Sequence, residues 1–436
     1  MSGSFVVHYS EIALKGKNRP EFVKMLRRNI GRALTGLEPE IHPLQGRFFL
    51  TVKGDKAEGE RRLAKVFGVA WFAEAAVVDP EYGKIKDAVI ESARSSSGKS
   101  FKINPRRADK SFPINSMELA RTLGGEVAEA TGKKVDLSNP DVQVHVDVLK
   151  DRALVYSRKV RGPGGLPVGT AGRVMHLFSG GIDSPPAAWL MMKRGCRPVY
   201  LHFYLAPTGE APLKSKVMEE VKALSAWGGK STLVLVPFAE YQLATAEAPN
   251  DLEPSLFRRF MRMTAEALAP LFGASGISTG DSLSQAASQT LWNLAAFDQG
   301  STLPVLRPLL TYDKEEIITL AKQIGTYETS LEEYKDCCAI ISRHPRTKAK
   351  GELISKFADE LGFRVLLAKS LRWATLVSYN PATGETKVTP LDEAMRRPPA
   401  GQASGGSLKG AEAELSVPPR QNYKQATGNG FSGDTT

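Results

Sequence analysis

The chain has 436 residues, of which 42% are hydrophobic and 24% are charged, and its formal net charge at pH 7 is +11. This length exceeds the usual size of a domain with one hydrophobic core, so we expect two or three domains. The composition is that of a globular protein and not of a disordered or fibrous chain. No apolar run reaches the roughly 18 residues of a membrane helix and the N-terminus lacks the apolar core of a signal peptide, so we expect a cytoplasmic protein without a membrane partner.

The positive charge is concentrated in the front of the chain. Residues 1–172 contain nine more basic than acidic residues, whereas residues 173–436 contain only two more. This asymmetry favours a nucleic-acid-facing half joined to a nearly neutral half. A solvated basic surface without a partner fits the same distribution equally well.

Cysteine usage excludes a fold built on disulfides. The chain has three cysteines, Cys196, Cys337 and Cys338, which are too few for a disulfide scaffold. In a reducing compartment such residues are buried, catalytic or metal-binding.

In the front half, short strand patterns are mixed with amphipathic helices. We predict an N-terminal domain at 1–57, a second α+β domain at 58–161 and a Gly- and Pro-rich linker at 162–172. The expected elements are helices at 20–34 and 58–66, a strand at 100–107, a helix capped by Asn115 or Ser116, a strand at 141–149 and its antiparallel partner at 152–160.

Beyond the linker, apolar runs alternate with amphipathic segments, as is typical of βαβ units. Strands are predicted at 174–178, 198–204, 231–238 and 276–280, and helices at 185–194, 215–227, 253–269 and 314–325. The alternation predicts a doubly wound α/β domain with a parallel sheet at 173–396. Residues 397–436 are dominated by Gly, Ala, Ser, Pro and Gln, so we expect a disordered tail there.

The most specific motif is Ser-Gly-Gly-Ile-Asp-Ser, which begins at Ser179 directly after the first strand of this domain. Gly180 and Gly181 permit a tight turn that exposes backbone N–H groups, and the following helix N-terminus adds a partial positive charge. Ser179 and Ser184 can donate to phosphate oxygens. Asp183 would repel phosphate unless a cation intervened, which suggests Mg²⁺ with Asp183 as its ligand.

This motif is not a Walker A loop, because no Gly-Lys-Ser/Thr follows its glycines. The pattern SGGxDS instead resembles the PP-loop of ATP pyrophosphatases, which cleave ATP between its α and β phosphates and transfer AMP to a carbonyl-like oxygen. An ordinary glycine turn between a strand and a helix is the alternative interpretation.

Five collinear segments together resemble one family, the tRNA 4-thiouridine synthetases (tRNA sulfurtransferases of the ThiI type). These segments are 10–22, 101–124, 162–185, 278–290 and 305–317. The resemblance implies a ferredoxin-like N-terminal domain, a THUMP RNA-binding domain and a PP-loop domain. It also implies an ATP-dependent enzyme that adenylates a uracil oxygen and replaces it with sulfur, and in some organisms serves thiazole (thiamine) synthesis.

Carried onto this chain, the family's nucleotide site consists of strand ends, the PP-loop and three later positions. Its residues are Leu177, Phe178, Ser179, Gly180, Gly181, Ser184, His202, Phe203, Arg258, Gly280 and Gln289. The ends of parallel strands border the crevice in which doubly wound sheets bind ligands. Alternatively, the two phenylalanines are core residues, Arg258 is a surface charge and Gln289 caps a helix. Asp281 stands where the family usually has Glu.

Replacing oxygen by sulfur requires a sulfur nucleophile. The segment around Cys337 and Cys338 resembles the family's cysteine segment. By this resemblance, Cys338 is the counterpart of the catalytic cysteine, and Cys337 is a close second. Nearby cations favour a thiolate; they are Arg343, His344, Arg346 and Lys348. Many bacterial members continue into a rhodanese domain with a second cysteine, whereas no cysteine follows Cys338 here. We therefore expect sulfur from a cysteine desulfurase or another donor; an iron–sulfur cluster on the three cysteines is the less favoured alternative.

Basic residues of the front half are the candidate contacts to tRNA. They are Lys15, Lys17, Arg19, Lys102, Arg106, Arg107 and Lys110, with Lys133, Lys134, Arg158, Lys159 and Arg161 as a second group. Phosphate attraction would supply affinity, and single-stranded ends would supply selectivity. In the resembling family this half presents the uridine at position 8 to the crevice, and a homodimer is compatible with the sequence.

The sequence leaves three other functions open. Another PP-loop enzyme, such as a 2-thiouridine, 2-thiocytidine or amide-forming synthetase, would lack the THUMP-like front half, and the thiocytidine type carries paired CxxC motifs that are absent here. A non-catalytic RNA-binding protein would not require the intact SGGIDS motif. A THUMP-containing methyltransferase would need a Gly-rich methyl-donor loop, which the sequence lacks.

Overall fold

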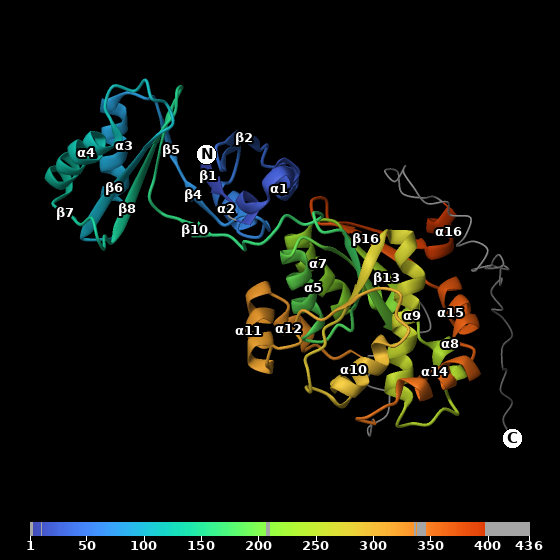
Figure 1. Ribbon diagram of the computed structural model, residues 1–436. Helices are drawn as coiled ribbons and strands as arrows, with labels where there is room; N and C mark the ends of the chain where they lie inside the picture. The colour runs from blue at the N-terminus through green and yellow to red at the C-terminus, as the bar shows by residue number, and fades with distance from the viewer. Residues whose placement is uncertain (1–2, 10, 206–209, 335–336, 338–345, 397–436) are drawn as a thin grey trace, which may run out of the picture.

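The computed structural model describes residues 3–9, 11–205, 210–334, 337 and 346–396, arranged as three sheets that follow one another along the chain. Figure 1 shows the first two sheets, with their helices, forming an elongated front half that is set off from a larger rear domain. The predicted tail at 397–436 lies outside the described residues. Among the helices that are described, none is long and apolar enough to span a membrane.

The first sheet is antiparallel, with the order β10-β4-β1-β3-β2. Its elements are β1 (Gly3–His8), β2 (Glu40–Leu44), β3 (Arg47–Val52), β4 (Trp71–Glu74) and β10 (Val160–Arg161), with α1 (Arg19–Ala33), α2 (Lys56–Leu63) and the 3₁₀ turns η1 (Glu11–Leu14) and η2 (Gly16–Asn18). Leu26 and Ile30 of α1 pack against Phe5, Phe48 and Phe72 of the strands.

The first domain extends beyond its predicted end at residue 57. β4 pairs with β1, and Leu63 of α2 is buried in the same core, so the chain up to about residue 75 belongs to this sheet. The chain also returns at β10, which pairs with β4. The predicted boundary at 57/58 is therefore wrong, because strand pairing across the domain is not visible in a local pattern.

The second sheet has the order β5-β9-β8-β6-β7, and two helices pack on it. Its elements are β5 (Ala76–Val78), β6 (Ser100–Arg107), β7 (Lys134–Val135), β8 (Val142–Val148), β9 (Ala153–Tyr156), α3 (Tyr82–Arg94) and α4 (Ser116–Thr131). The Asn115 side chain accepts a hydrogen bond from the Glu118 amide at 2.9 Å, which confirms the predicted N-cap. β9 is the predicted antiparallel partner of β8, but it ends at Tyr156.

The rear sheet has the order β15-β14-β11-β12-β13-β16-β17. Its strands are β11 (Arg173–Leu177), β12 (Arg197–Tyr204), β13 (Ser231–Pro237), β14 (Ala274–Ser278), β15 (Val305–Leu306), β16 (Thr375–Asn380) and β17 (Glu385–Pro390). β11 to β14 are parallel, as predicted, and β15, which was not predicted, adds a fifth parallel strand. β16 and β17 form an antiparallel hairpin on β13 that the sequence pattern did not predict. The strand order runs outward from β11 in both directions, to β12 and β13 on one side and to β14 and β15 on the other, so the topological switch point lies beside β11.

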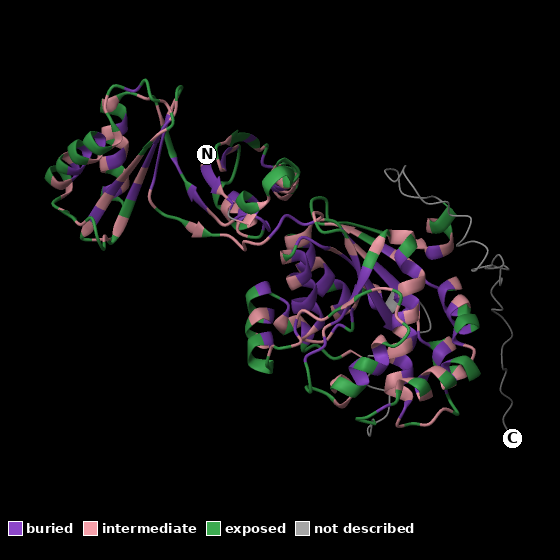
Figure 2. Ribbon diagram, in the orientation of Figure 1, coloured by how far each residue is buried: buried purple, intermediate pink, exposed green. Residues whose placement is uncertain are grey.

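Helices cover both faces of this sheet (Figure 1). They are α5 (Ser184–Lys193), α6 (Glu210–Leu213), α7 (Lys216–Gly228), α8 (Ala239–Ala244), α9 (Glu253–Phe272), η3 (Ala287–Gln289), α10 (Leu291–Asp298), α11 (Lys314–Ile324), α12 (Tyr327–Ser330), α14 (Gly351–Glu360), α15 (Phe363–Arg372) and α16 (Leu391–Arg396). Figure 2 shows that the central strands are buried almost throughout, as expected for a sheet covered on both faces.

The first domain is joined to the rear domain by an aromatic contact. Phe67 lies against Trp189 of α5 and Trp227 of α7, with ring centroids 5.1 and 5.9 Å away. The predicted linker at 162–172 contributes to this joint, because Val168 is buried in the same cluster and its carbonyl accepts a hydrogen bond from Asn29 of α1. The basic front half is thus fixed to the two helices that follow β11 and β12.

Candidate nucleotide and sulfur-transfer site

The PP-loop candidate forms the turn between β11 and α5, as predicted. Gly180 has a φ of +78°, and a Cβ atom there would lie 2.7 Å from Cγ2 of Val217 on α7. Glycine is therefore required both by the backbone conformation and by the close packing. The Ser179 hydroxyl accepts a hydrogen bond from the Gly181 amide at 3.2 Å and lies 3.3 Å from the Ser184 hydroxyl. The turn and the α5 N-terminus together suit an anion.

A buried histidine that sequence reasoning missed holds this turn in place. His176 of β11 contacts the Ser278 hydroxyl of β14 at 2.6 Å and the Ser184 carbonyl oxygen at 2.9 Å. Burial lowers the pKa of His176 to about 4, so the ring is neutral at pH 7. A polar residue within the apolar strand pattern was the available signal.

Asp183 is held by two residues that were not predicted to belong to the site. Its Oδ1 lies 2.8 Å from Nζ of Lys314 at the start of α11, and its Oδ2 accepts a hydrogen bond from Nε2 of Gln285 at 2.7 Å. Both residues lie within segments that resemble the family, but more than a hundred positions from Asp183 in sequence. The carboxylate and the ammonium group together place a charged pair beside the loop.

Gly280 lies against the same loop. A Cβ atom on Gly280 would stand 3.1 Å from the carbonyl carbon of Asp183 and from the amide nitrogen of Ser184. This close backbone approach explains the glycine without a positive φ. The β14 end is thereby placed at the opening of α5.

Arg258 lies in a buried charge network next to Gly280. Its guanidinium forms two hydrogen bonds to Asp281, at 2.9 and 2.8 Å, and Arg307 contacts the same carboxylate at 3.2 Å. Burial opposes ionisation of Asp281, but Arg258, Thr279 and Arg307 outweigh it and lower the pKa of Asp281 to about 2. Arg258 thus positions Asp281, and its contact with a nucleotide stays a prediction.

We expect Asp281→Asn to destabilise the protein by about 3–5 kcal/mol at pH 7, because two largely shielded guanidinium groups lose their shared buried carboxylate. Urea denaturation followed by circular dichroism measures this change. Since the folded-state pKa is depressed, the stabilisation is present above about pH 4 and is lost as the pH falls towards 2. Asp298→Asn is the matched control, since Asp298 is more exposed and contacts Arg307 alone in this network. Equal losses for the two variants would contradict the prediction.

The predicted strand-end residues are brought together with the cysteine segment. His202 of β12 contacts the Phe178 carbonyl oxygen at 2.8 Å and the Tyr334 hydroxyl at 2.9 Å. The Cys337 thiol donates to the Phe203 carbonyl oxygen at 3.3 Å. The rings of Phe178 and Phe203 are buried in the core, so only their backbone groups are suited to contact adenine.

The two described cysteines, Cys196 and Cys337, occupy different surroundings. Cys337 is buried, and its thiol is bonded to a backbone carbonyl oxygen. Cys338, together with Arg343 and His344, lies outside the described residues. Of the other predicted cations, Arg346 pairs with Asp251 and Lys348 lies over the Trp292 ring. Cys196 packs in a separate small cluster with Val174 and Met191.

The Gln289 side chain, predicted to belong to the nucleotide site, has an unpaired buried acceptor. Among the described residues, Oε1 of Gln289 has no hydrogen-bond partner although it is shielded from solvent. An unpaired buried acceptor is costly unless a ligand donates to it. An adenine amino group or a ribose hydroxyl has the required donor, so this observation fits a nucleotide. In the described part of the chain, no group of three or more His, Cys, Asp or Glu side chains is arranged to hold a metal ion.

The junction of the two front domains contains a cavity of about 370 Å³ with cationic and aromatic walls. Arg106 and Lys159, both predicted RNA contacts, line it beside stacked His8–Trp71 and His145–Tyr156 pairs. Burial and neighbouring cations lower the pKa of His8 to about 3 and that of His145 to about 4, so both rings are neutral. Flat neutral rings with adjacent cations suit nucleotides.

The other predicted RNA contacts differ in whether their side chains already have a contact within the protein. Arg107 donates to the Phe112 carbonyl at 2.7 Å, and Lys102 donates to the Leu137 carbonyl at 3.0 Å, so both have structural roles. Lys15 lies over Phe22, and Arg19 donates to the Tyr9 hydroxyl. Lys17 and Lys110 are both exposed, and neither has a side-chain hydrogen bond or ion pair to another described residue.

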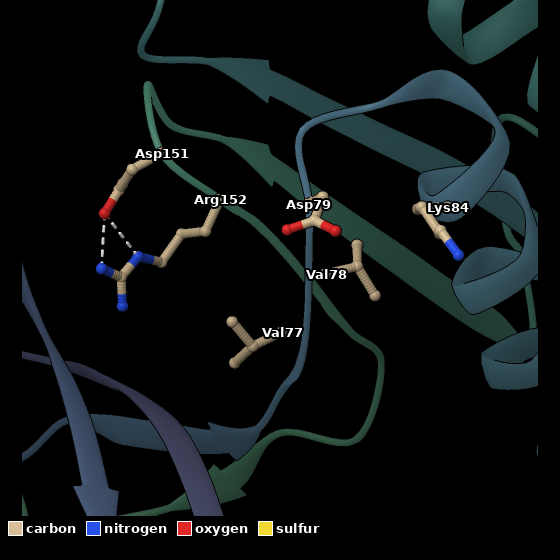
Figure 3. Close-up of a pocket in the computed structure, with 6 residues that line it drawn as sticks. All are labelled: Val77, Val78, Asp79, Lys84, Asp151 and Arg152. Carbon is tan, nitrogen blue, oxygen red and sulfur yellow. Dashed lines mark hydrogen bonds and ion pairs between the residues drawn. The ribbon is translucent and has the colours of Figure 1, made fainter.

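A second cavity, of about 400 Å³, lies beside β5 (Figure 3). Val77, Val78, Asp79, Lys84, Asp151 and Arg152 line it. Asp151 and Arg152 pair with each other, and none of the predicted RNA contacts takes part.

The fold and the site define the chain as a PP-loop α/β domain preceded by a two-domain α+β front half. Residues 169–363 match the family described as thiamine biosynthesis protein (ThiI), residues 83–158 match the THUMP domain, and residues 4–73 match the ThiI ferredoxin-like domain. The last match agrees with the sheet pairing that places β4 in the first domain.

Relatives and a solved structure agree with these matches. Probable tRNA sulfurtransferases of Moorella thermoacetica and Thermus thermophilus are 38% and 39% identical over 385 and 375 residues, which is 87% and 85% of this chain and 99% and 92% of theirs. A crystal structure of a 4-thiouridine synthetase–RNA complex with bound ATP aligns with a TM-score of 0.78 and 32% identity, covering 89% of this chain and 99% of that one. The chain therefore belongs to the ThiI family of tRNA sulfurtransferases.

Proposed function

We propose that this protein uses ATP to convert a tRNA uridine, at position 8, into 4-thiouridine. The observation that carries the proposal is the arrangement around β11 and β12. The phosphate-type loop with its Asp183–Lys314 pair lies after one strand, and Cys337 contacts the end of the next. The combination joins a nucleotide cradle to a sulfur nucleophile within one crevice.

In the first step, the uracil O4 attacks the α-phosphorus of ATP and pyrophosphate leaves. The loop amides and the hydroxyls of Ser179 and Ser184 would bind the pyrophosphate, and Lys314 would neutralise charge that develops on it. Backbone groups of the β11 and β12 ends would orient adenine, and Gln289 would accept a hydrogen bond from the nucleotide. The resulting bond to AMP makes the oxygen of C4 a leaving group.

Mg²⁺ fits this arrangement with Asp183 as its protein ligand, because Mg²⁺ is commonly held by one or two carboxylates together with phosphate oxygens and water. When bound, it would screen the phosphate charge that Asp183 otherwise repels.

In the second step, sulfur replaces the activated oxygen. A cysteine desulfurase would load Cys338 with a persulfide, whose terminal sulfur attacks C4 and expels AMP. The Cys337 thiolate would then attack the inner sulfur of Cys338, which breaks the S–S bond and leaves sulfur on C4. The Cys337–Cys338 disulfide so formed needs a reducing thiol before the next cycle. The same persulfide would serve thiazole synthesis, as the family resemblance implies.

Nucleoside analysis tests the proposed function directly. Unmodified tRNA incubated with the protein, ATP, Mg²⁺, cysteine, a cysteine desulfurase and a reducing thiol is expected to contain 4-thiouridine after digestion, and omission of ATP is expected to abolish the product. Formation of a different thiolated base, or of none, would overturn the proposal.

The front half is proposed to hold the tRNA, and Arg106 provides the sharpest test. Arg106→Glu is expected to weaken tRNA binding and to reduce the slope of log affinity against log salt by about 1, because one phosphate contact is lost. Filter binding at several salt concentrations measures both. Arg107 is unsuitable because it anchors Phe112.

Arg94→Glu is the matched control for Arg106, since Arg94 is exposed and lies on α3, outside both front-half cavities. An equal loss of tRNA affinity in both variants would show a nonspecific charge effect. ATP binding is expected to be unchanged in either protein.

A further inference from the structure

Glu220 on α7 is a buried acid that the proposed mechanism does not use. Its side chain is 0% exposed, and neither carboxyl oxygen has a hydrogen-bond partner among the described residues. A fully buried carboxyl without a partner is costly, especially when ionised. Its retention in the core therefore calls for a role.

Glu220 lies behind the PP-loop. A Cβ atom on Gly180 would stand 3.8 Å from Oε2 of Glu220, 3.8 Å from Cε of Lys216 and 2.7 Å from Val217. These three α7 residues form the wall against which the loop is pressed. A charge on Glu220 would consequently act directly on the segment proposed to bind phosphates.

Lys216 links this wall to the cysteine segment. It lies one helical turn before Glu220, and its Nζ donates to the Ser330 carbonyl oxygen at 2.8 Å. Ser330 ends α12, shortly before Cys337 along the chain. An ionised Glu220 would attract the Lys216 ammonium away from Ser330, whereas a neutral carboxylic acid leaves that hydrogen bond intact.

The surroundings favour the neutral acid at pH 7. Burial raises the pKa of Glu220 to about 8; Lys216 opposes the rise, and Glu332 beyond α12 adds to it. The other titratable groups in the cluster on which α7 packs include Tyr200 and Tyr204, whose pKa values burial also raises, so they stay uncharged.

We propose that Glu220 is a positioning residue for the PP-loop that acts as a neutral carboxylic acid, and that its ionisation weakens ATP binding by placing negative charge behind Gly180. This inference rests on the proposed function, since it assumes that the loop binds ATP. A polar but uncharged side chain of the same shape should therefore replace Glu220 without loss.

Calorimetric titration with ATP at constant Mg²⁺, between about pH 7 and 9, tests the inference. For the unmodified protein, Kd is expected to rise by up to about tenfold per pH unit above pH 8, whereas for Glu220→Gln it should stay flat. Glu219→Gln, on the exposed side of α7, is the control and should keep the pH dependence of the unmodified protein. Parallel rises for Glu220→Gln and the unmodified protein would overturn the inference.

A second variant covers the case in which Glu220→Gln does not fold. Lys216→Met removes the cation that favours ionised Glu220, so the loss of ATP affinity should begin at a higher pH; an unmoved onset would overturn the inference. Absence of ATP binding at every pH would overturn the proposed function and this inference together. If the unmodified protein and the Glu220 and Lys216 variants all bind ATP with the same pH profile, only the role proposed for Glu220 is excluded.

Discussion

Asp183→Asn is expected to reduce tRNA thiolation by at least about 10²–10³-fold at saturating ATP, which is the range for losing one preorganised charge contact at a reacting phosphate. The substitution keeps the side-chain shape at the start of α5 but removes the negative charge that holds Lys314 and would bind Mg²⁺. The Gln285 amide can still donate to the remaining amide oxygen. Quantifying 4-thiouridine in tRNA over time measures the rate.

Two further variants separate this effect from a loss of structure. Lys314→Met removes the other member of the ion pair and should also lower the rate of thiolation. Glu315→Gln, at the exposed neighbouring position on α11, should leave the rate unchanged. Circular dichroism should give the same spectrum for all of them. An Asp183→Asn protein that thiolates tRNA at the normal rate would exclude the proposed site.

Local sequence patterns were sufficient to predict the strand and the helix on either side of the PP-loop. The apolar run of β11, the glycines after it and the helix that follows are neighbours in sequence, so periodicity and turn chemistry define them. The N-cap at Asn115 was predictable for the same reason, because cap and first turn lie within four residues.

The partners of those elements were not predictable, because they come from distant segments. Lys314 and Gln285 contact Asp183 only after the sheet has brought β14 and α11 to the same edge. Arg258 was expected in the nucleotide site, yet its bidentate partner is Asp281, which the sequence marked only as a departure from the family's usual Glu. Spacing in sequence contains no information on such pairings, whereas the family resemblance had already placed these segments within one domain.

The domain boundary was predicted at the wrong position for the same reason, because it depends on contacts between segments that are distant in sequence. α2 has a helical pattern that fits either neighbour, and only the pairing of β4 with β1 assigns it to the first domain. β10 likewise looked like the end of a single strand that began near residue 152, but it pairs with β4. Strand partners determine domain membership, and they are non-local.

Cys338→Ser is expected to abolish thiolation when sulfur comes from cysteine and a desulfurase, with a loss of at least about 100-fold, because a serine hydroxyl cannot form a persulfide. Pyrophosphate release from ATP with tRNA should persist, since the first step needs no thiol. Cys196→Ser, in its separate apolar cluster, is the control and should keep full activity. Mass spectrometry should find one added sulfur atom on the cysteine pair of the unmodified protein.

Cys337 should behave differently because of its surroundings. Its thiol is buried and donates to the Phe203 carbonyl, so a desulfurase has poor access to it and it should be a poor first acceptor of sulfur. Cys337→Ser is therefore expected to accept sulfur on Cys338 but to release it slowly to the uridine, so that the persulfide accumulates. Sulfur found on neither cysteine after treatment with desulfurase would refute persulfide transfer, while an unaffected Cys338→Ser protein would assign the nucleophile to another group. Because the Cys337 thiol is buried and bonded to the end of β12, we expect the two single substitutions to differ: Cys337→Ser should accumulate persulfide, whereas Cys338→Ser should form none.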